Sequence, residues 1–290
     1  MSTTHIERPV LELQDVSLGY GPPSSRTEVL ANTNLKIWPN EFVAIIGFSG
    51  SGKSTLVSLL SGLENPSEGY VFYKNREMPG PGPERGVMFQ NYSLLPWLTV
   101  QGNIEMAVRQ VFPRMPKDQR KIHVAHYIEM VNLTPARDKR PAELSGGMRQ
   151  RVSLARTLAT KPDVLLLDEP LSALDAITRA NLQDEIIRIW EQDRKTVVMV
   201  TNDVDEALLM ADRIVPLTKG PAASLAEPFE VKISRPRDRT TINQEPQFMK
   251  LRHEITKFLL SMDGEEEATG QGTQQTWQMP DLQPVDFNAA

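Results

Sequence analysis

Gly47-Phe-Ser-Gly-Ser-Gly-Lys-Ser54 is the stretch that decides the fold of this chain, because it fits the phosphate-binding pattern G-x-x-x-x-G-K-[ST]. The apolar run Phe42-Val-Ala-Ile-Ile46 precedes it, and apolar residues follow it at helical spacing. This order of strand, glycine loop and helix predicts backbone N–H groups that close around the phosphates of a nucleotide. In the loop, Lys53 supplies a positive charge and Ser54 offers an oxygen to Mg²⁺. The residues expected to hold the nucleotide are Gly47, Ser49, Gly50, Ser51, Gly52, Lys53, Ser54 and Thr55.

Leu144-Ser-Gly-Gly-Met148 is a second segment suited to phosphate. Ser145 is a good helix N-cap residue, although a serine followed by small residues is common at helix starts. Apolar residues then recur at helical spacing from Val152 to Leu158. The segment therefore predicts a second helix N-terminus that can face an anion.

Together the two segments resemble the P-loop (Gly47–Ser54) and the signature segment (Leu144–Met148) of the ATP-binding subunit of ABC transporters. The resemblance covers about residues 9–220. In that family, the signature segment of one subunit closes on the γ-phosphate of ATP held by the P-loop of a second subunit. The resemblance thus implies a working unit of two such chains with ATP and Mg²⁺ as cofactors. In that unit Ser145, Gly146 and Gly147 would contact the ATP of the partner subunit.

The composition is that of a globular protein without special covalent features. Hydrophobic residues make up 40% of the 290 residues, enough for a full core. A net charge of −5 argues against general nucleic-acid binding, and the lack of cysteine excludes disulfides and thiolate metal sites. The polar N-terminus lacks the apolar core of a secretory signal, and the apolar runs are far shorter than the ~20 residues that span a bilayer. We therefore expect any membrane role to go through a partner.

Strand and helix patterns alternate along the chain, which predicts an α/β fold. With the resemblance, this implies a RecA-like P-loop NTPase core, an antiparallel β subdomain and an α-helical insert that carries the signature. The alternation over residues 10–20 predicts an edge strand. Further strands are expected at 29–37, 41–46, 69–73, 86–89, 164–167, 196–200 and 229–233, and helices at 100–111, 116–131, 177–192 and 246–260.

We expect one nucleotide-binding domain over residues 9–263, preceded by a flexible N-terminus at 1–8. Its helical insert is expected at about 91–158, and a C-terminal extension at about 221–263. Residues 264–290 are rich in Gln, Glu, Thr, Gly and Pro and cannot bury enough surface to offset their ordering entropy. We therefore expect a disordered tail there.

Asp168 and Glu169 end an apolar strand, at the sheet edge where α/β proteins bind phosphate. By resemblance, Asp168 holds Mg²⁺ through water and Glu169 polarises the attacking water. The alternative for an Asp-Glu pair at a strand end is a helix N-cap. Gln90 resembles the family's glutamine that touches Mg²⁺ and links the core to the helical insert, and its alternative is an ordinary loop residue.

Several aromatic and loop residues also fit the family. Tyr20 is placed where the family stacks an aromatic ring on adenine, although it could simply pack on its strand. The apolar Leu94-Leu-Pro-Trp97 is either core or part of a groove for a short helix of the membrane subunit, in which a tryptophan would be a good anchor. Ser172-Ala-Leu-Asp175 resembles the loop that faces the opposite site across the dimer.

Two residues depart from the family pattern. Met148 ends the signature where many relatives have glutamine, which removes one polar contact. Asn202 follows the last core strand, where the family usually places a histidine that contacts the γ-phosphate. Asparagine can donate a hydrogen bond, but it is shorter than histidine and cannot become cationic. The resemblance implies that Asn202 shares the catalytic site with Glu169 and Gln90.

The branch of the family is indicated by Pro81-Gly-Pro-Glu-Arg-Gly-Val-Met-Phe-Gln90 and Ser234-Arg-Pro-Arg-Asp-Arg239. These segments are similar to the nitrate, sulfonate, taurine and bicarbonate importers, and Asn202 to the shorter ATPase subunit of cyanobacterial-type nitrate or bicarbonate importers. The implied partners are a second, longer ATPase subunit, permease subunits and indirectly a solute-binding protein, at the cytoplasmic face of the inner membrane. The alternatives are a soluble ABC ATPase acting on DNA or ribosomes and a regulatory nucleotide sensor.

Overall fold

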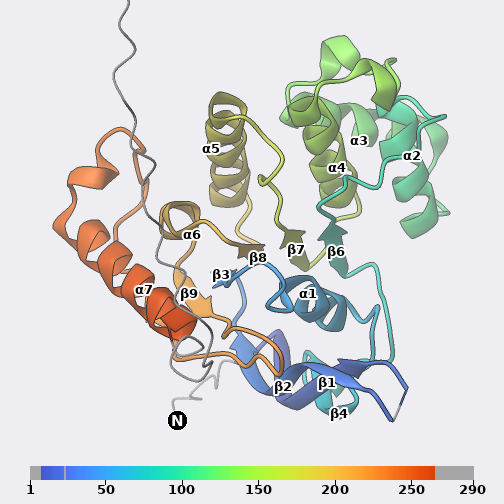
Figure 1. The fold of residues 1–290 in the computed structure, drawn as a ribbon. Coiled ribbons are helices and arrows are strands. Elements are labelled where there is room, and N and C mark those ends of the chain that lie inside the picture. Colours follow the sequence, from blue (N-terminus) through green and yellow to red (C-terminus); the bar gives the residue numbers. More distant parts are fainter. Residues whose placement is uncertain (1–7, 23, 265–290) are drawn as a thin grey trace, which may run out of the picture.

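The apolar run before the glycine loop forms β3 (Phe42–Ile46), an inner strand of a six-stranded sheet (Figure 1). The computed structural model describes residues 8–22 and 24–264. The strand order in this sheet is β10-β9-β3-β8-β7-β6, and all neighbouring strands run parallel except β10 and β9. The other strands are β6 (Arg85–Met88), β7 (Val164–Asp168), β8 (Thr196–Thr201), β9 (Arg213–Pro216) and β10 (Phe229–Glu230).

A second sheet, with the order β2-β1-β4-β5, is antiparallel. It consists of β1 (Leu11–Tyr20), β2 (Thr27–Ile37), β4 (Glu68–Tyr73) and β5 (Arg76–Glu77). The prediction of an edge strand at 10–20 is wrong, because β1 pairs with β2 on one side and β4 on the other. Alternation reports one buried face of a strand, but it carries no information on whether both edges are paired.

Each inner strand of the large sheet sends alternate side chains into two separate cores. In β3, Phe42, Ala44 and Ile46 face one core, whereas Val43 and Ile45 face the other. Because both faces are covered, the strands are continuously apolar, as parallel strands usually are. The second core lies between the two sheets and contains the apolar residues of α1 (Lys53–Ser61). The combination of both sheets confirms the predicted P-loop NTPase fold with an antiparallel β subdomain.

Helices cover the other face of the large sheet. Three of them, α2 (Val100–Val111), α3 (Lys117–Met130) and α4 (Gly146–Ala159), pack on one another at the β6 side of the sheet (Figure 1). The short 3₁₀ turns Thr134–Ala136 and Pro141–Glu143 lie between α3 and α4. We call this group the helical insert. The remaining helices are α5 (Ala176–Gln192), α6 (Val204–Met210) and α7 (Pro246–Gly264), with a 3₁₀ turn at Ile242–Gln244 before α7.

The expected domain limits stay predictions, and the expected termini fall mostly outside the described residues, which exclude 1–7 and 265–290. The described helices include none that is long and apolar enough to cross a membrane. The sequence interpretation did not assign α6 and β9, since seven and four residues are too few for a clear periodicity.

The basic turn at 235–239 attaches the C-terminal extension to the core. Arg237 is only 8% exposed and donates to the carbonyl oxygens of Leu208 (2.8 Å) and Ala211 (2.6 Å) at the end of α6. Burial lowers the pKa of Arg237 to about 10, so the guanidinium stays charged at neutral pH. Arg235 stacks on Trp190 of α5 at 4.3 Å and pairs with Asp212 at 2.8 Å. The turn is therefore a structural clamp.

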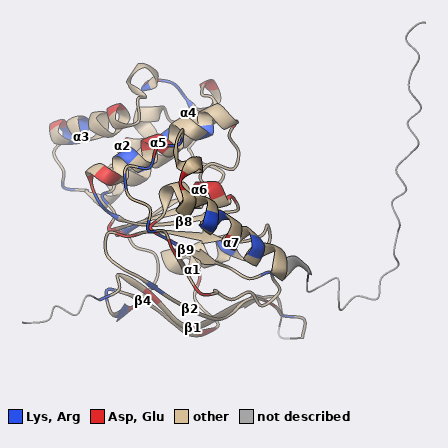
Figure 2. Cartoon of the chain, turned by 90° about the vertical axis from the view of Figure 1, so that its left-hand side faces the viewer, with Lys and Arg blue, Asp and Glu red and all other residues tan. Residues whose placement is uncertain are grey.

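Replacing Arg237 with methionine is expected to lower the free energy of unfolding by about 3 kcal/mol, because several buried carbonyl groups lose their donor. Urea unfolding measures this loss. Arg252→Met is the matched control, since Arg252 also ties the extension to α6 but pairs with Asp205 at the surface (2.7 Å). Figure 2 shows this face, where basic residues of α7 lie beside acidic residues of α6. The control should cost less than about 1 kcal/mol, and equal costs would contradict the clamp.

Candidate active site

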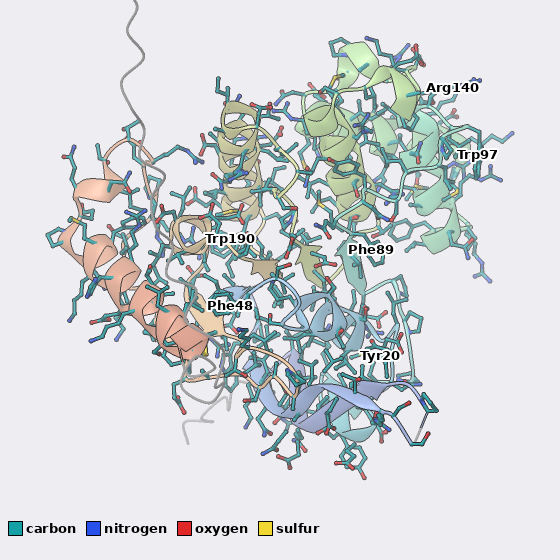
Figure 3. The ribbon with its side chains drawn as sticks, in the orientation of Figure 1. Tyr20, Phe48, Phe89, Trp97, Arg140 and Trp190 are labelled. Atoms are coloured by element: carbon teal, nitrogen blue, oxygen red, sulfur yellow. The ribbon has the colours of Figure 1, made fainter. Side chains whose placement is uncertain are left out.

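The loop between β3 and α1 wraps around a buried lysine. Lys53 is 4% exposed, and its Nζ donates to the carbonyl oxygens of Gly47 at 3.0 Å and Phe48 at 2.7 Å. The same ammonium lies 3.3 Å from Oε1 of Glu169. Figure 3 labels Phe48 at this loop, beside β3. A buried ammonium needs such partners because an unpaired charge is very costly to remove from water.

The backbone of this loop has the conformation that phosphate binding requires. Gly50 and Gly52 have φ of 78° and 95°, a region that residues with a Cβ rarely adopt. A Cβ on Gly52 would also meet Val29 Cγ1 at 2.9 Å, whereas one on Gly50 would meet nothing within 4 Å. Gly52 caps α1 without a side-chain hydrogen bond, so no side chain competes for the helix N-terminus. This arrangement fits an anion at the start of α1.

The other predicted loop residues differ in their surroundings. Ser49 is exposed, Thr55 is half-buried in the first turn of α1, and Ser51 is 2% exposed. The Oγ of Ser51 has no hydrogen-bond partner within the described part of the chain. A buried hydroxyl without a partner beside a phosphate loop is consistent with a site built for a polar ligand.

The start of α1 and the end of β7 bring Ser54 and Asp168 together. Ser54 Oγ donates to Asp168 Oδ1 at 3.1 Å, across 114 residues of sequence. Burial raises the pKa of Asp168, as does the neighbouring Glu169 carboxylate, while the Ser54 hydrogen bond and Lys53 oppose the rise. A hydroxyl and a carboxylate are oxygen ligands of the kind that Mg²⁺ prefers. The donor set therefore fits the predicted Mg²⁺ position.

Glu169 adopts a left-handed backbone conformation with φ of 44°. Its N–H donates to Val200 O at 3.1 Å, and its Oε2 accepts a hydrogen bond from Gln90 Nε2 at 3.3 Å. The carboxylate thus lies between Lys53 and Gln90. The helix N-cap alternative is wrong, because the next helix, α5, is capped by Asp175, whose Oδ1 accepts from Thr178 N at 3.0 Å. A non-glycine residue in this conformation is strained, which often marks a functional position.

Asn202 borders the same cavity as Glu169, although 33 positions separate them in the sequence. The cavity has a volume of about 180 Å³. Its lining is formed by Glu169, Leu171, Ser172, Arg179, Thr201, Asn202, Asp203 and Glu206. The neighbouring ends of β7 and β8 produce this proximity, since Asp168 pairs in register with Val200.

The signature segment is close to α5 and to the loop before it. Ser145 caps α4, and its Oγ accepts from Met148 N at 3.3 Å. A Cβ on Gly147 would collide with Thr178 Cγ2, and one on Gly146 would meet Leu174 Cδ2 at 3.7 Å. Among the described residues, we find no hydrogen bond or ion pair that joins Ser145, Gly146 or Gly147 to the P-loop. This separation is consistent with use of the two segments on different nucleotides.

Tyr20 ends β1 and is 44% exposed, so its ring is accessible to a planar ligand. Its role in stacking on adenine stays a prediction.

The sequence interpretation missed Arg156 of α4, which donates to Tyr92 O at 2.9 Å and also contacts Ser93 O. Arg156 thereby ties the segment after Gln90 to the signature helix. Nothing in its local sequence distinguishes it from a surface arginine.

The site and the fold define a P-loop ATPase with a separate signature helix. Comparison with known proteins agrees: residues 30–172 match the family model described as ABC transporter. The chain is 48% identical over 253 residues to the nitrate transport protein NasD of Klebsiella oxytoca, covering 87% of this chain and 97% of that protein. The chain therefore belongs to the ABC transporter family, as an ATP-binding subunit with ATPase activity.

Two further comparisons add detail. The bicarbonate transport ATP-binding protein CmpC of Synechococcus elongatus is 51% identical over 240 residues, which cover 82% of this chain but 36% of that protein. A solved dimer of the ATP-binding cassette MJ0796 bound to ADP and Pi is 31% identical, with a TM-score of 0.69. The likeness covers 77% of this chain and 100% of the solved one.

Glu169→Gln is expected to keep ATP binding and lower the hydrolysis rate at this site by about 10²-fold or more, since an amide cannot polarise water as a carboxylate does. ATP binding and phosphate release by the assembled complex, with the change in both ATPase subunits, measure this. Asp138→Asn, at an exposed carboxylate, is the control. Unchanged turnover in the Glu169→Gln complex would refute the catalytic role.

Proposed function

We propose that this chain is the ATP-hydrolysing subunit that powers import of nitrate or nitrite through a membrane permease. The observation that carries the proposal is the likeness to NasD over 97% of that protein, whose name states nitrate transport. The contacts of Lys53 with Glu169 and of Ser54 with Asp168 support the hydrolytic part. Bicarbonate import is the second candidate, because CmpC, named for bicarbonate transport, is similarly related.

The site residues divide the work of phosphoryl transfer, which needs mostly positioning and neutralisation of charge. The loop amides from Gly47 to Thr55 and the Lys53 ammonium hold the β- and γ-phosphates. Mg²⁺, when bound, neutralises phosphate charge, and Ser54, Asp168 and Gln90 are the residues that would hold it. Glu169 orients and polarises the attacking water, and the amide of Gln90 keeps its carboxylate in place.

The signature segment would act on a second subunit. Ser145, Gly146 and Gly147 would complete the ATP site of the partner, and the partner's signature would complete the site on Lys53. The dimeric structure of the MJ0796 cassette supports a two-chain unit. The partner that we propose is a longer ATPase subunit, in view of the likeness to CmpC, which extends far beyond the matched region.

A groove on the helical insert is the proposed contact with the permease. It has a volume of about 530 Å³ and is lined by Leu98, Gly102, Glu105, Met106, Arg109 and Gln110. Trp97, next to Leu98, is 67% exposed, and Figure 3 shows it at the outer side of the helical insert. An exposed tryptophan beside a groove suits a short cytoplasmic helix of a membrane subunit. The chain would then sit peripherally at the cytoplasmic face of the inner membrane, with the solute-binding protein reached only through the permease.

The transported anion can be identified with the assembled transporter in proteoliposomes to which its solute-binding protein is added. Nitrate is expected to raise ATP hydrolysis several-fold, and bicarbonate or taurine to leave it near the basal rate. The same complex with Lys53→Ala and the equivalent change in the second ATPase subunit is the control, and should not respond to any anion. Stimulation by bicarbonate alone would favour the second candidate.

Asn202 predicts unequal sites in a heterodimer. Removing one pre-placed donor to a developing phosphate charge costs about 10²–10³ in rate, roughly 2.7–4 kcal/mol, and asparagine should recover part of this. Lys53→Ala is therefore expected to leave much of the ATPase activity of the complex. The corresponding lysine change in a histidine-containing partner should abolish it. Equal losses from the two changes, or a fully active transporter built on this chain alone, would contradict the asymmetry.

A further inference from the structure

A line of hydrogen bonds, which we call the relay, runs from the partly exposed Arg239 of the C-terminal extension to the loop that carries Asn202. Arg239, in the basic turn, donates through Nη1 to Oε1 of Gln183 on α5. Gln183 Nε2 then donates to Oε1 of Glu206 on α6 at 3.1 Å. Gln183 and Glu206 are 3% and 5% exposed. Three segments far apart in the sequence therefore share one polar network, which starts at the half-buried Arg239 and continues inside the protein.

The direction of each hydrogen bond in this line is determined by the chemistry of its ends. An arginine can only donate, so it must face the carbonyl oxygen of the Gln183 amide. The amide nitrogen is thereby directed to the carboxylate of Glu206. Desolvation raises the pKa of Glu206, whereas the hydrogen bonds from Thr201 and Gln183 lower it. A buried acceptor that lost these donors would be costly, so the line favours one geometry.

The other end of Glu206 holds the loop after β8. Its Oε2 accepts from the hydroxyl of Thr201, which is 3% exposed. Since that hydroxyl donates to Glu206, its lone pair is free to accept the N–H of Asp203, at 3.1 Å. Asp203 in turn accepts from Glu206 N at 3.0 Å through Oδ1, which caps α6. Both neighbours of Asn202 are thus attached to the same glutamate.

Asn202 itself is exposed and makes none of these bonds. Its position beside the Glu169 cavity is therefore set by the two residues that flank it. Glu206 and Thr201 line that cavity too. Any change in the direction of the Glu206 carboxylate would move Thr201 and Asp203 together, and with them the Asn202 side chain.

We propose that Arg239 of the C-terminal extension is a positioning residue for ATP hydrolysis, which acts through Gln183 and Glu206 on the Thr201–Asn202–Asp203 loop. The extension thereby controls the turnover of this chain's ATP site without touching nucleotide. This inference rests on the proposed function, specifically on the role given there to Asn202.

The test uses the assembled transporter in which the other ATPase subunit carries glutamine at its catalytic carboxylate, so that released phosphate comes from the site on Lys53. Arg239→Ala is expected to lower kcat about tenfold while KM for ATP stays within about twofold, because the relay orients a loop and holds no nucleotide. Arg239→Lys should recover part of the rate, since lysine can still donate to Gln183. Gln183→Met breaks the relay while leaving the contacts of Arg239 with Ala180 (3.1 Å) and Asp184 (2.8 Å), and should give a similar loss.

Arg252→Ala is the matched control, because Arg252 connects the same extension to α6 through Asp205 and is outside the relay. It should leave kcat unchanged, and melting temperatures identify any variant that is simply unfolded. In an Asn202→Ala background, Arg239→Ala should add less than about twofold, as expected for residues that act as one unit.

The outcomes separate the relay from the proposed function. If Asn202→Ala lowers kcat while Arg239→Ala and Gln183→Met leave kcat unchanged, the relay is overturned and the proposed function is not. So would fully additive effects of Arg239→Ala and Asn202→Ala. Unchanged kcat in Asn202→Ala would contradict the role of Asn202 in the proposed function, and the relay with it.

Discussion

The buried ammonium of Lys53 is the constraint on which the rest of the site depends. A charge removed from water must be surrounded by acceptors, and here these are two loop carbonyls and the Glu169 carboxylate. To supply them, the loop must curl at glycines with positive φ, and β7 must end beside β3's loop. The same arrangement brings a positive charge and a carboxylate together at the place where we propose that the γ-phosphate binds.

The parallel sheet makes this arrangement possible. Its strands carry apolar side chains to both faces, so the polar groups of the site gather where the strands end. β3 ends in the P-loop, β6 is followed by Gln90, β7 ends in Asp168 and β8 ends at Thr201. Each of these strands contributes one part of the site. The in-register pairing of β7 with β8 sets the distance between Glu169, the proposed catalytic carboxylate, and the Asn202 loop.

Several arginines connect segments that are far apart in the sequence. Arg156 fixes the segment after Gln90 to the signature helix, and Arg237 closes the end of α6 with its guanidinium. Planar guanidinium groups suit such positions, because one side chain can satisfy several carbonyl oxygens at once. Hydrogen bonds, and not only apolar packing, thus attach three parts of the protein to the ATP site. These are the signature helix, the segment after Gln90 and the C-terminal extension.

The sequence by itself determined the ATP-binding loop, the core strands other than β9, and the identity of Ser54, Asp168, Glu169 and Gln90 as site residues to be tested. It could do so because glycine geometry and apolar periodicity are local properties. It could not determine that β1 is paired on both edges, that Ser51 is buried without a partner, or that Arg156 and Arg237 are anchors. Only the tertiary structure decided these, since each depends on groups distant in sequence. The connection of Arg239 to the Asn202 loop is of the same kind, because its members lie on three separate segments that only folding brings together.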